Sequence, residues 1–571
     1  MRKLKKFTAS VLALLLGTGS LAGFAACGDG EQTINNDTTV NIKVIKQGYG
    51  VAWLYELETQ FETAFAEEGY QVNILEPSED YSGSVVVNEL YQGYNEIGVD
   101  LYITAAQAQN MGIHGEYNKV LVEDIRESVY NMPAIGYDGE EESLKISEKL
   151  SKDVVPFMCD DTGAMYGFNW VQAAAGMVVN TKKLAKYGVT ELPRTTNEMF
   201  DIFEKIYLGA NGQKNSYEST TYPITYFAGA NGYQLCMLMV WLAQYDPDFY
   251  QQFWTMEDAQ GNPLKDNGYE LFNHPAITDM LTLAHRTFDL NIAAYGSTTQ
   301  GLDQAQAKIM KEDGSDAVFY AVGDWMINEV KLNYRNYLND VEFMNFPVTS
   351  ALGTKTFGAG TKYNLSVAKC DEVLSHIIKL VDENKTVDEI VTSVFEEFNV
   401  TIDEADALKI AKARGTYYTR GVEQMAYITK DAVGKEVAAK FLRMMASEDF
   451  AVTFSNLANA TTPYTSTENT TTRYKFVNQA SKIAVNDYVS LISHRAKGFR
   501  KELDYLSNIF VTVSHIPSKI STSEIESIWN DEGGKSGKDI SVYEKAAKAM
   551  QKAEYDNAKA NWSKWLSSAG Y

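Results

Sequence analysis

The chain has 571 residues, more than one hydrophobic core usually supports, so two lobes or one domain with large insertions are expected. Apolar residues make up 45% and charged residues 22%, which excludes a disordered or collagen-like chain. The formal net charge is −24, and no block of lysine and arginine reverses it locally. We therefore expect no binding to nucleic acid.

The chain begins with the pattern of a secretory signal. A basic start, Arg2 to Lys6, precedes an apolar stretch that is too short and too glycine-interrupted to span a membrane. Cys27 directly follows two alanines, as in a bacterial lipobox, where the cysteine is acylated and becomes the mature N-terminus. We predict a lipoprotein signal peptide over 1–26 and a flexible tether over 27–39. The alternative is an ordinary cleavable signal in which Cys27 is incidental.

Strands and helices then alternate along the chain. Alternating or helically spaced apolar residues predict, in order, a strand at 40–45, a helix at 51–66, a strand at 71–75, a helix at 84–93 and a strand at 99–103. This order favours a mostly parallel sheet with helices on its faces. Later strands are predicted at 178–181 and 317–320, and long helices at 197–207, 274–290 and 434–445. Residues 369–414 differ, because they predict two or three amphipathic helices that form an insertion.

The remaining cysteines and the histidines predict no metal site. Cys159, Cys236 and Cys370 lie far apart and form no C-x-x-C pair. We expect buried free thiols, and one bridged pair is the alternative. The six histidines are scattered, with no two at helical metal-binding spacing.

Two glycine-rich motifs resemble nucleotide-binding loops but lack essential residues. Gly48-Tyr49-Gly50 follows a strand, yet Trp53 stands where the third glycine of a dinucleotide-binding loop is needed. Gly534-Lys535-Ser536 resembles the end of a P-loop, but Trp529 replaces its leading glycine. The sequence has no G-x-S-x-G and no H-E-x-x-H. We predict no cofactor and no enzymatic activity.

Several stretches follow one another in an order typical of one family. They are the strand, glycine, aromatic and helix at 42–61, Tyr166–Trp170 with Gly176–Leu184, the apolar strand from Ala317 that ends in Gly323-Asp324-Trp325, Phe346-Pro347 with Gly358–Gly360, and the helix Lys435–Leu442. Over residues 41 to 565 the chain resembles the bacterial extracellular solute-binding proteins of ABC importers, in the sugar-binding group that includes maltose-binding protein. The insertion at 369–414 and the Lys- and Ala-rich C-terminal region depart from that pattern.

The resemblance implies an α/β, two-lobed periplasmic-binding-protein fold of type II, with mixed sheets flanked by helices and a hinge cleft. Lobe 1 would comprise 40–164 and about 352–480, including the insertion at 369–414. Lobe 2 would comprise about 165–351 and 481–571. In this fold the lobes close about the hinge when ligand binds between them.

The resemblance also implies which residues line the cleft. Sugars present C–H faces and hydroxyl edges, so aromatic rings and polar side chains at strand ends are the expected lining. These positions are Trp53, Asp80, Trp170, Tyr226, Tyr233, Asp324, Trp325 and Trp529. Other interpretations stay open: Trp53 as a core residue of its helix, Trp170 as packing on the hinge, and Asp80 as a helix N-cap. Tyr226 and Tyr233 fit loop packing as well.

The function implied by the resemblance is capture of a carbohydrate, in particular an oligosaccharide, and its delivery to the permease subunits of an ABC importer. We expect a monomer, exported and held by its lipidated Cys27 at the outer face of the cytoplasmic membrane. A binding protein for a non-sugar solute, a surface sensor and a glycan-active enzyme are the alternatives. The sequence leaves the identity of the sugar open.

Overall fold

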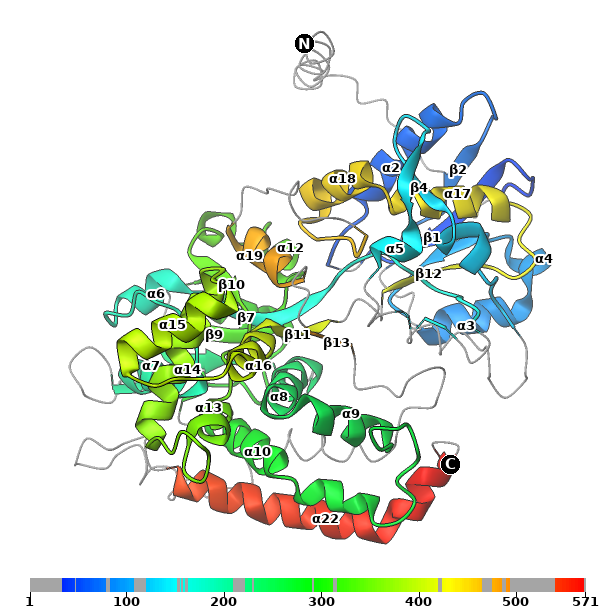
Figure 1. Cartoon of the computed structure of the whole chain (residues 1–571). Coiled ribbons are helices and arrows are strands. Elements are labelled where there is room, and N and C mark those ends of the chain that lie inside the picture. Colours follow the sequence, from blue (N-terminus) through cyan, green and yellow to red (C-terminus); the bar gives the residue numbers. More distant parts are fainter. Residues whose placement is uncertain are drawn as a thin grey trace.

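The computed structural model describes residues 33–46, 48–78, 83–106, 120–150, 155, 158–159, 163–208, 221–227, 231–289, 292–311, 316–419, 424–464, 475–484, 489–492, 540–568 and 571. The chain forms two α/β lobes, each with its own sheet and hydrophobic core (Figure 1). The first lobe contains the described residues of 33–171 and 424–464, and the second lobe those of 172–419 and 475–571. The predicted two-lobed α/β fold with mixed sheets is confirmed.

The first lobe is built on a five-stranded sheet in the order β2-β1-β3-β12-β6. Three parallel strands come from the N-terminal part: β1 (Thr39–Val44), β2 (Gln71–Ile74) and β3 (Leu101–Ile103). Two antiparallel pairings add β12 (Met425–Ile428) and β6 (Phe168–Asn169). The sheet is accompanied by α2 (Ala52–Ala64), α3 (Gly83–Gln92), α4 (Tyr94–Ile97), α17 (Lys435–Met445) and α18 (Glu448–Ala458), while α5 (Ile146–Lys149) follows the hairpin of β4 (Pro133–Ile135) and β5 (Glu141–Lys145).

Helix α2 forms as its sequence predicts. Trp53, Leu54, Leu57 and Phe61 recur at helical spacing and are all buried. Gly69, with φ of +71°, then turns the chain back toward β2, a backbone conformation that glycine adopts without strain.

The N-terminal tether is shorter than expected. Ile34 N donates to Asn41 Oδ1 (2.9 Å), and Asn41 Nδ2 donates back to Ile34 O (3.0 Å). Residues from 34 onward are therefore attached to β1, although the sequence placed them in a tether that extends to 39. The signal segment and Cys27 lie outside the described residues.

The second lobe is built on a six-stranded mixed sheet. Its order is β13-β11-β7-β9-β8, and β10 pairs with the far end of β7. The strands are β7 (Ala174–Asn180), β8 (Tyr222–Thr225), β9 (Ala317–Gly323), β10 (Val341–Met344), β11 (Thr416–Thr419) and β13 (Val489–Ile492). Its helices include α6 (Thr181–Ala185), α7 (Thr196–Leu208), α8 (Asn231–Tyr245), α9 (Pro247–Thr255), α10 (Pro275–Thr287), α11 (Leu302–Met310), α12 (Met326–Val330), α13 (Ser350–Phe357) and α19 (Lys475–Ala484).

The predicted insertion contains three helices, of which the first two are clearly amphipathic: α14 (Val367–Asp382), α15 (Val387–Phe398) and α16 (Glu404–Gly415). Ser366 and Thr386 cap the first two through their side chains. The sequence assigned this segment to lobe 1, and the structure corrects that assignment. The segment packs with Val348, Leu352 and Phe357 of the second lobe, and the strand that follows it, β11, pairs with β7. Helix α19 likewise packs with β10, so residues 475–480, which the sequence assigned to lobe 1, also belong to the second lobe. Residues 165–171 were assigned to lobe 2, but β6 pairs with β12 and this stretch lies in the first-lobe core.

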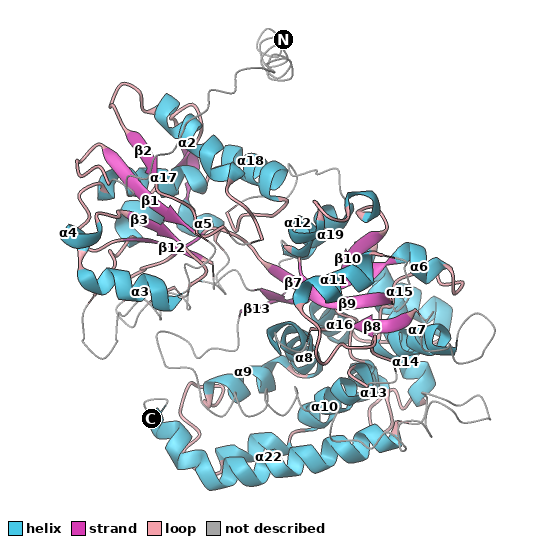
Figure 2. Ribbon diagram, turned by 180° about the vertical axis from the view of Figure 1, so that it is seen from behind, coloured by secondary structure: helices cyan, strands magenta, loops and turns pink. Residues whose placement is uncertain are grey.

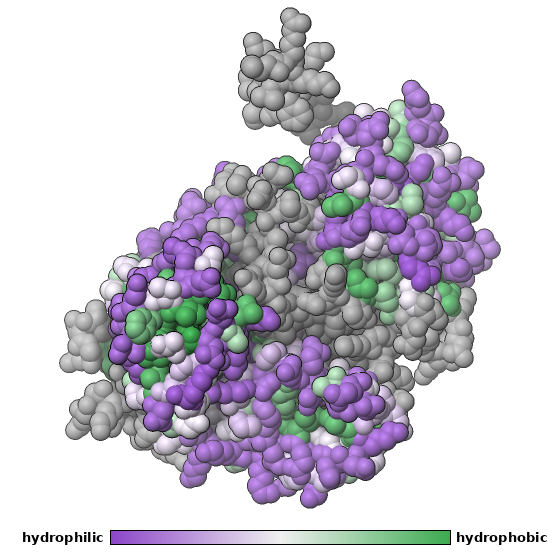
Figure 3. All heavy atoms as spheres, viewed as in Figure 1, coloured by the Kyte–Doolittle hydropathy of each residue, from purple (hydrophilic) through white to green (hydrophobic). Residues whose placement is uncertain are grey.

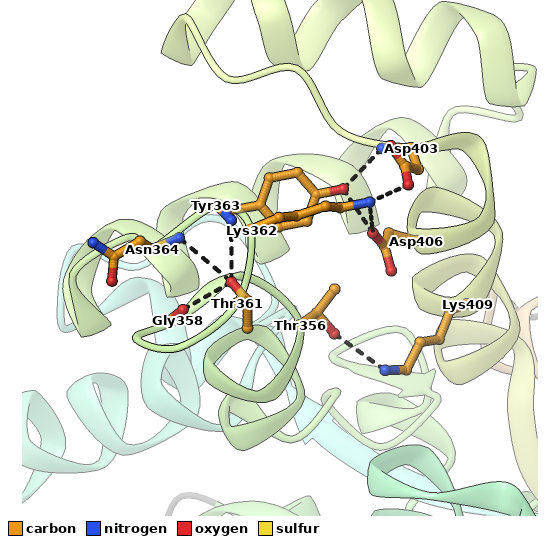
Figure 4. Close-up of polar contacts among 9 residues, drawn as sticks. All are labelled: Thr356, Gly358, Thr361, Lys362, Tyr363, Asn364, Asp403, Asp406 and Lys409. Carbon is orange, nitrogen blue, oxygen red and sulfur yellow. Dashed lines mark hydrogen bonds and ion pairs between the residues drawn. The ribbon is translucent and has the colours of Figure 1, made fainter.

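The loop after α13 is fastened to α16 by polar side chains (Figure 4). Tyr363 Oη donates to Asp406 Oδ2 (2.7 Å) and accepts from the backbone N of Asp403 (2.9 Å). Lys362 pairs with both carboxylates. These bonds fix the three-helix segment to the rest of the second lobe at its surface.

The last helix, α22 (Ser541–Ser568), runs along the outside of the second lobe against α10 (Figure 1). Tyr543 Oη donates to Asp289 Oδ2 (2.7 Å), and Trp562 Nε1 donates to Leu264 O (2.8 Å). The described C-terminal residues therefore belong to the second lobe, where the sequence placed them.

On the face shown in Figure 3, most of the described surface is polar. Figure 3 shows apolar side chains gathered on the second lobe around α15, where Phe395 is 51% exposed and Val367 at the start of α14 is 66% exposed. Within the described part of the chain, no helix is both long enough and apolar enough to cross a membrane.

Candidate functional site

The two lobes meet where α18 of the first lobe faces α12 of the second (Figures 1 and 2). Asn328 on α12 donates through Nδ2 to Ala458 O, and its Oδ1 accepts from Asn459 Nδ2 (2.7 Å). The loop after β1 also reaches this junction, since Tyr49 Oη donates to Asp324 of the second lobe (3.4 Å). We call this region the lobe junction.

The two tryptophans expected from the first lobe lie in its core. Trp53 and Trp170 stack with ring centroids 5.5 Å apart and an interplanar angle of 21°. Their exposed fractions are 0% and 1%. Their indole nitrogens donate to Gly50 O (2.9 Å) and Thr104 O (3.1 Å). Both tryptophans therefore have a packing role in the first lobe, which was the alternative interpretation of each, because neither ring presents a face to the lobe junction.

Trp325 is placed differently, at the end of β9. Its ring lies across Gly323, where a Cβ atom would come within 2.0 Å of the indole, so only glycine permits this position. The ring is half-buried and lies 5.7 Å from the ring of Tyr233, in the first turn of α8. It also contacts the first-lobe core, and its Cβ lies 3.1 Å from where a Cβ on Gly48 would stand. Trp325 and Tyr233 are therefore brought together at the lobe junction.

Asp324 links the two lobes through its carboxyl group. Its Oδ2 accepts from the backbone N of Ala174 (3.2 Å), at the start of the crossing strand β7, and its Oδ1 accepts from Tyr49 Oη. The side chain is 4% exposed, and burial raises the pKa of this carboxyl to about 7. Its position next to the crossing strand favours a role in positioning Trp325 and the lobes.

Glu329 at the lobe junction was missed by the sequence analysis. It follows Trp325 by one helical turn on α12, and its Oε1 lies 3.5 Å from where a Cβ on Gly48 would stand. Gln306 Nε2, on α11, donates to its Oε2. Burial raises the pKa of Glu329 to about 7. The i, i+4 spacing from Trp325 is the signal that identifies it.

The other expected site residues do not join this group. Tyr226 is buried in the second-lobe core against Phe288, with ring centroids 5.3 Å apart, and burial raises its pKa. Asp80 and Trp529 lie outside the described residues.

No metal centre is found where the chain is described. Among those residues, no group of three or more His, Cys, Asp or Glu side chains is arranged to hold a metal ion. Cys159, Cys236 and Cys370 are free thiols, and the last two are buried. At the lobe junction, the described residues offer the carboxyl groups of Asp324 and Glu329, the side-chain amides of Asn328 and Asn459, and the rings of Tyr49, Tyr233 and Trp325.

Comparison with known proteins identifies the fold. No protein-family model matches the chain, and no curated protein matches it in sequence. A probable secreted solute-binding lipoprotein from Streptomyces coelicolor matches with a TM-score of 0.51 and 11% identity, over 90% of this chain and 99% of that chain. A chitin oligosaccharide binding protein matches with a TM-score of 0.50 and 12% identity, over 91% and 98%.

The class defined by these matches is the two-lobed solute-binding fold. Identities of 11% and 12% establish the fold, and the match covers nearly the whole of both related chains. The expected resemblance to solute-binding proteins is confirmed at that level.

Proposed function

We propose that this protein captures a carbohydrate between its lobes and delivers it to the permease subunits of an ABC importer, without catalysing a reaction. The observation that carries the proposal is the placement of Trp325 beside Tyr233 at the lobe junction. The fold supports it, and one protein of the same fold is a chitin oligosaccharide binding protein. We propose that the protein acts as a monomer.

The physical basis is the match between a flat ring and a sugar. The C–H face of a pyranose packs on an indole, while its hydroxyl groups need polar partners at the edge of the ring. Trp325 supplies the ring, and Glu329 is a polar group one helical turn away. The crossing segments near Ala174 would let the lobes close over the ligand and exclude water.

A thermal-shift screen of the mature chain against mono- and oligosaccharides tests the proposal. A ligand that binds only the folded state raises the melting temperature, by an amount that grows with its concentration. We expect a saturable increase with at least one sugar and no turnover of that sugar. Release of products would instead establish a glycan-active enzyme. An increase with amino acids, peptides or polyamines alone would establish a different solute.

We further propose that the protein is exported and anchored by acylation at Cys27 to the outer face of the cytoplasmic membrane. The signal pattern before Cys27 supports this anchor. Several acyl chains hold a lipoprotein firmly, whereas a single chain binds membranes weakly. Replacing Cys27 with Ser should release the protein into the medium, and retention of that variant in the membrane would contradict the lipobox interpretation.

A further inference from the structure

Helix α12 turns three side chains toward the first lobe. Trp325 and Glu329 both approach Gly48, at 3.1 and 3.5 Å from where a Cβ on that glycine would stand. Asn328 bonds to the end of α18. Glu329 therefore faces the first lobe across the lobe junction, beside the ring of Trp325.

One oxygen of Glu329 is held, and the other faces the first lobe. Gln306, itself 3% exposed, donates to Oε2 from α11. Oε1 is the oxygen that lies toward Gly48. Because α11 also packs on β7, β8 and β9, Gln306 orients the carboxyl group before any ligand arrives.

Where the chain is described, the groups that interact electrostatically with Glu329 carry no positive charge. Asp303 on α11 and Tyr320 on β9 are the titratable groups that interact with it, and Asp303 adds negative charge. Lys331, two positions further along the chain, donates to Asn328 Oδ1 (3.1 Å). Among the described residues, Glu329 forms no ion pair with a lysine or arginine. A half-buried carboxylate in such surroundings is stabilised by hydrogen-bond donors and disfavours a second anion nearby.

We propose that Glu329, positioned by Gln306, accepts hydrogen bonds from the hydroxyl groups of a neutral sugar packed on Trp325, and that it selects against acidic sugars. This inference rests on the proposed carbohydrate function. Asp324 lies directly before Trp325 and gives the same region a second carboxyl group. A uronate carboxylate at this site would meet two acidic groups, whereas hydroxyl groups would satisfy Glu329.

The test is calorimetric titration at pH 8 with cellobiose, galactobiose and N,N′-diacetylchitobiose as neutral probes and digalacturonic acid as the acidic probe. We expect wild-type protein to bind a neutral probe at least about tenfold more tightly than the acid. Glu329→Gln should lower the affinity for the neutral probe by about tenfold or more, the range for a hydrogen bond to a charged group. It should also reduce the difference in affinity between the neutral and acidic probes. Asp303→Asn removes an exposed neighbouring charge that raises the pKa of Glu329, so it should narrow the difference in affinity between the acidic and neutral probes by less than Glu329→Gln does.

Titrations from pH 5.5 to 8 give a second readout that a purely structural role would not move. Hydroxyl donors favour the carboxylate, so neutral-sugar affinity should rise with pH. Asp324 titrates in the same range, and the contribution of Glu329 is the part of the rise lost in Glu329→Gln. Melting curves of each variant establish that it is folded. If the wild-type protein binds no sugar in the wider screen, the proposed function is wrong. If it binds sugar but Glu329→Gln binds equally well, or if the acid binds as tightly as the neutral probes, only this inference is overturned.

Discussion

The two lobes each place a tryptophan after a strand end, with opposite results. In the first lobe Trp53 follows β1 and is covered by Phe450 and Phe454 of α18, with ring centroids 5.8 and 5.3 Å away. In the second lobe Trp325 follows β9 and is only half-buried. A strand end is therefore insufficient to define a binding position. What decides is whether another element of the same lobe covers the ring.

The largest expected effect comes from removing a buried ring of the first-lobe core. Trp170→Ala should lower the free energy of unfolding by about 3–5 kcal/mol, because it leaves a cavity beside Trp53 and removes the bond to Thr104 O. Urea denaturation measures the change, and Trp170→Phe should lose less. A Trp170→Ala variant that melts normally but no longer binds sugar would show that this ring contacts the ligand and is not a core residue.

Replacing the half-buried Trp325 should change ligand affinity more than stability. If Trp325 packs on a sugar, Trp325→Ala should weaken binding by about 2 kcal/mol, or roughly thirtyfold, the magnitude of a binding hot spot. Its effect on unliganded stability should be smaller than that of Trp170→Ala, since the ring is only half-buried. Calorimetry beside a melting curve separates the two effects, with Trp325→Phe as the matched aromatic control. Early melting with unchanged affinity would instead place Trp325 among structural residues.

Asp324 links the two lobes, and its buried carboxyl group should make the stability of the protein depend on pH. Burial raises its pKa from 3.8 to about 7, so the folded state retains a proton that the unfolded state has already released between these values. Stability should therefore fall as pH rises from about 4 to about 7, by up to about 1.4 kcal/mol per pH unit for this group, and then level off. Asp324→Asn should flatten the profile partly, because Glu329 titrates in the same window. An unchanged pH profile in Asp324→Asn would contradict the assigned shift.

The smallest effect is expected where both partners are exposed. Lys362 and Asp403 fasten the three-helix segment with side chains that are 54% and 61% exposed. Lys362→Ala should reduce stability only slightly, and high salt should reduce the difference further. Urea denaturation at two salt concentrations provides the measurement. A loss as large as that of Trp170→Ala would mean that the segment's attachment depends on this pair.

Local elements could be predicted because their signals are local. The apolar spacing that begins at Trp53 defines α2, and the capping residues Ser366 and Thr386 stand where α14 and α15 begin. The same holds for strand β9, which ends at the Gly323 that the sequence singled out. In each case, the spacing of apolar residues and the residues at the ends of the element lie within a short stretch of sequence.

The assignment of segments to lobes could not be predicted in this way. The apolar face of an amphipathic helix such as α14 indicates that this face is buried, but it does not indicate which part of the molecule covers it. The contact of Leu374 with the second-lobe cluster around Phe357 settles the question, and it depends on how β11 pairs. The sequence therefore identified the three-helix segment correctly and placed it in the wrong lobe.

By itself, the sequence determined most element positions, because hydrophobic period and turn residues are local signals. The resemblance to solute-binding proteins added the two-lobed fold and Trp325 as a candidate at a strand end. Only the tertiary structure decided that Trp53 and Trp170 are core residues and that Glu329 faces Gly48 beside Trp325. The rings that cover Trp53 come from α18, almost 400 positions later in the chain. Burial is set by such distant neighbours, so no local pattern encodes whether an aromatic ring will meet the core or a ligand.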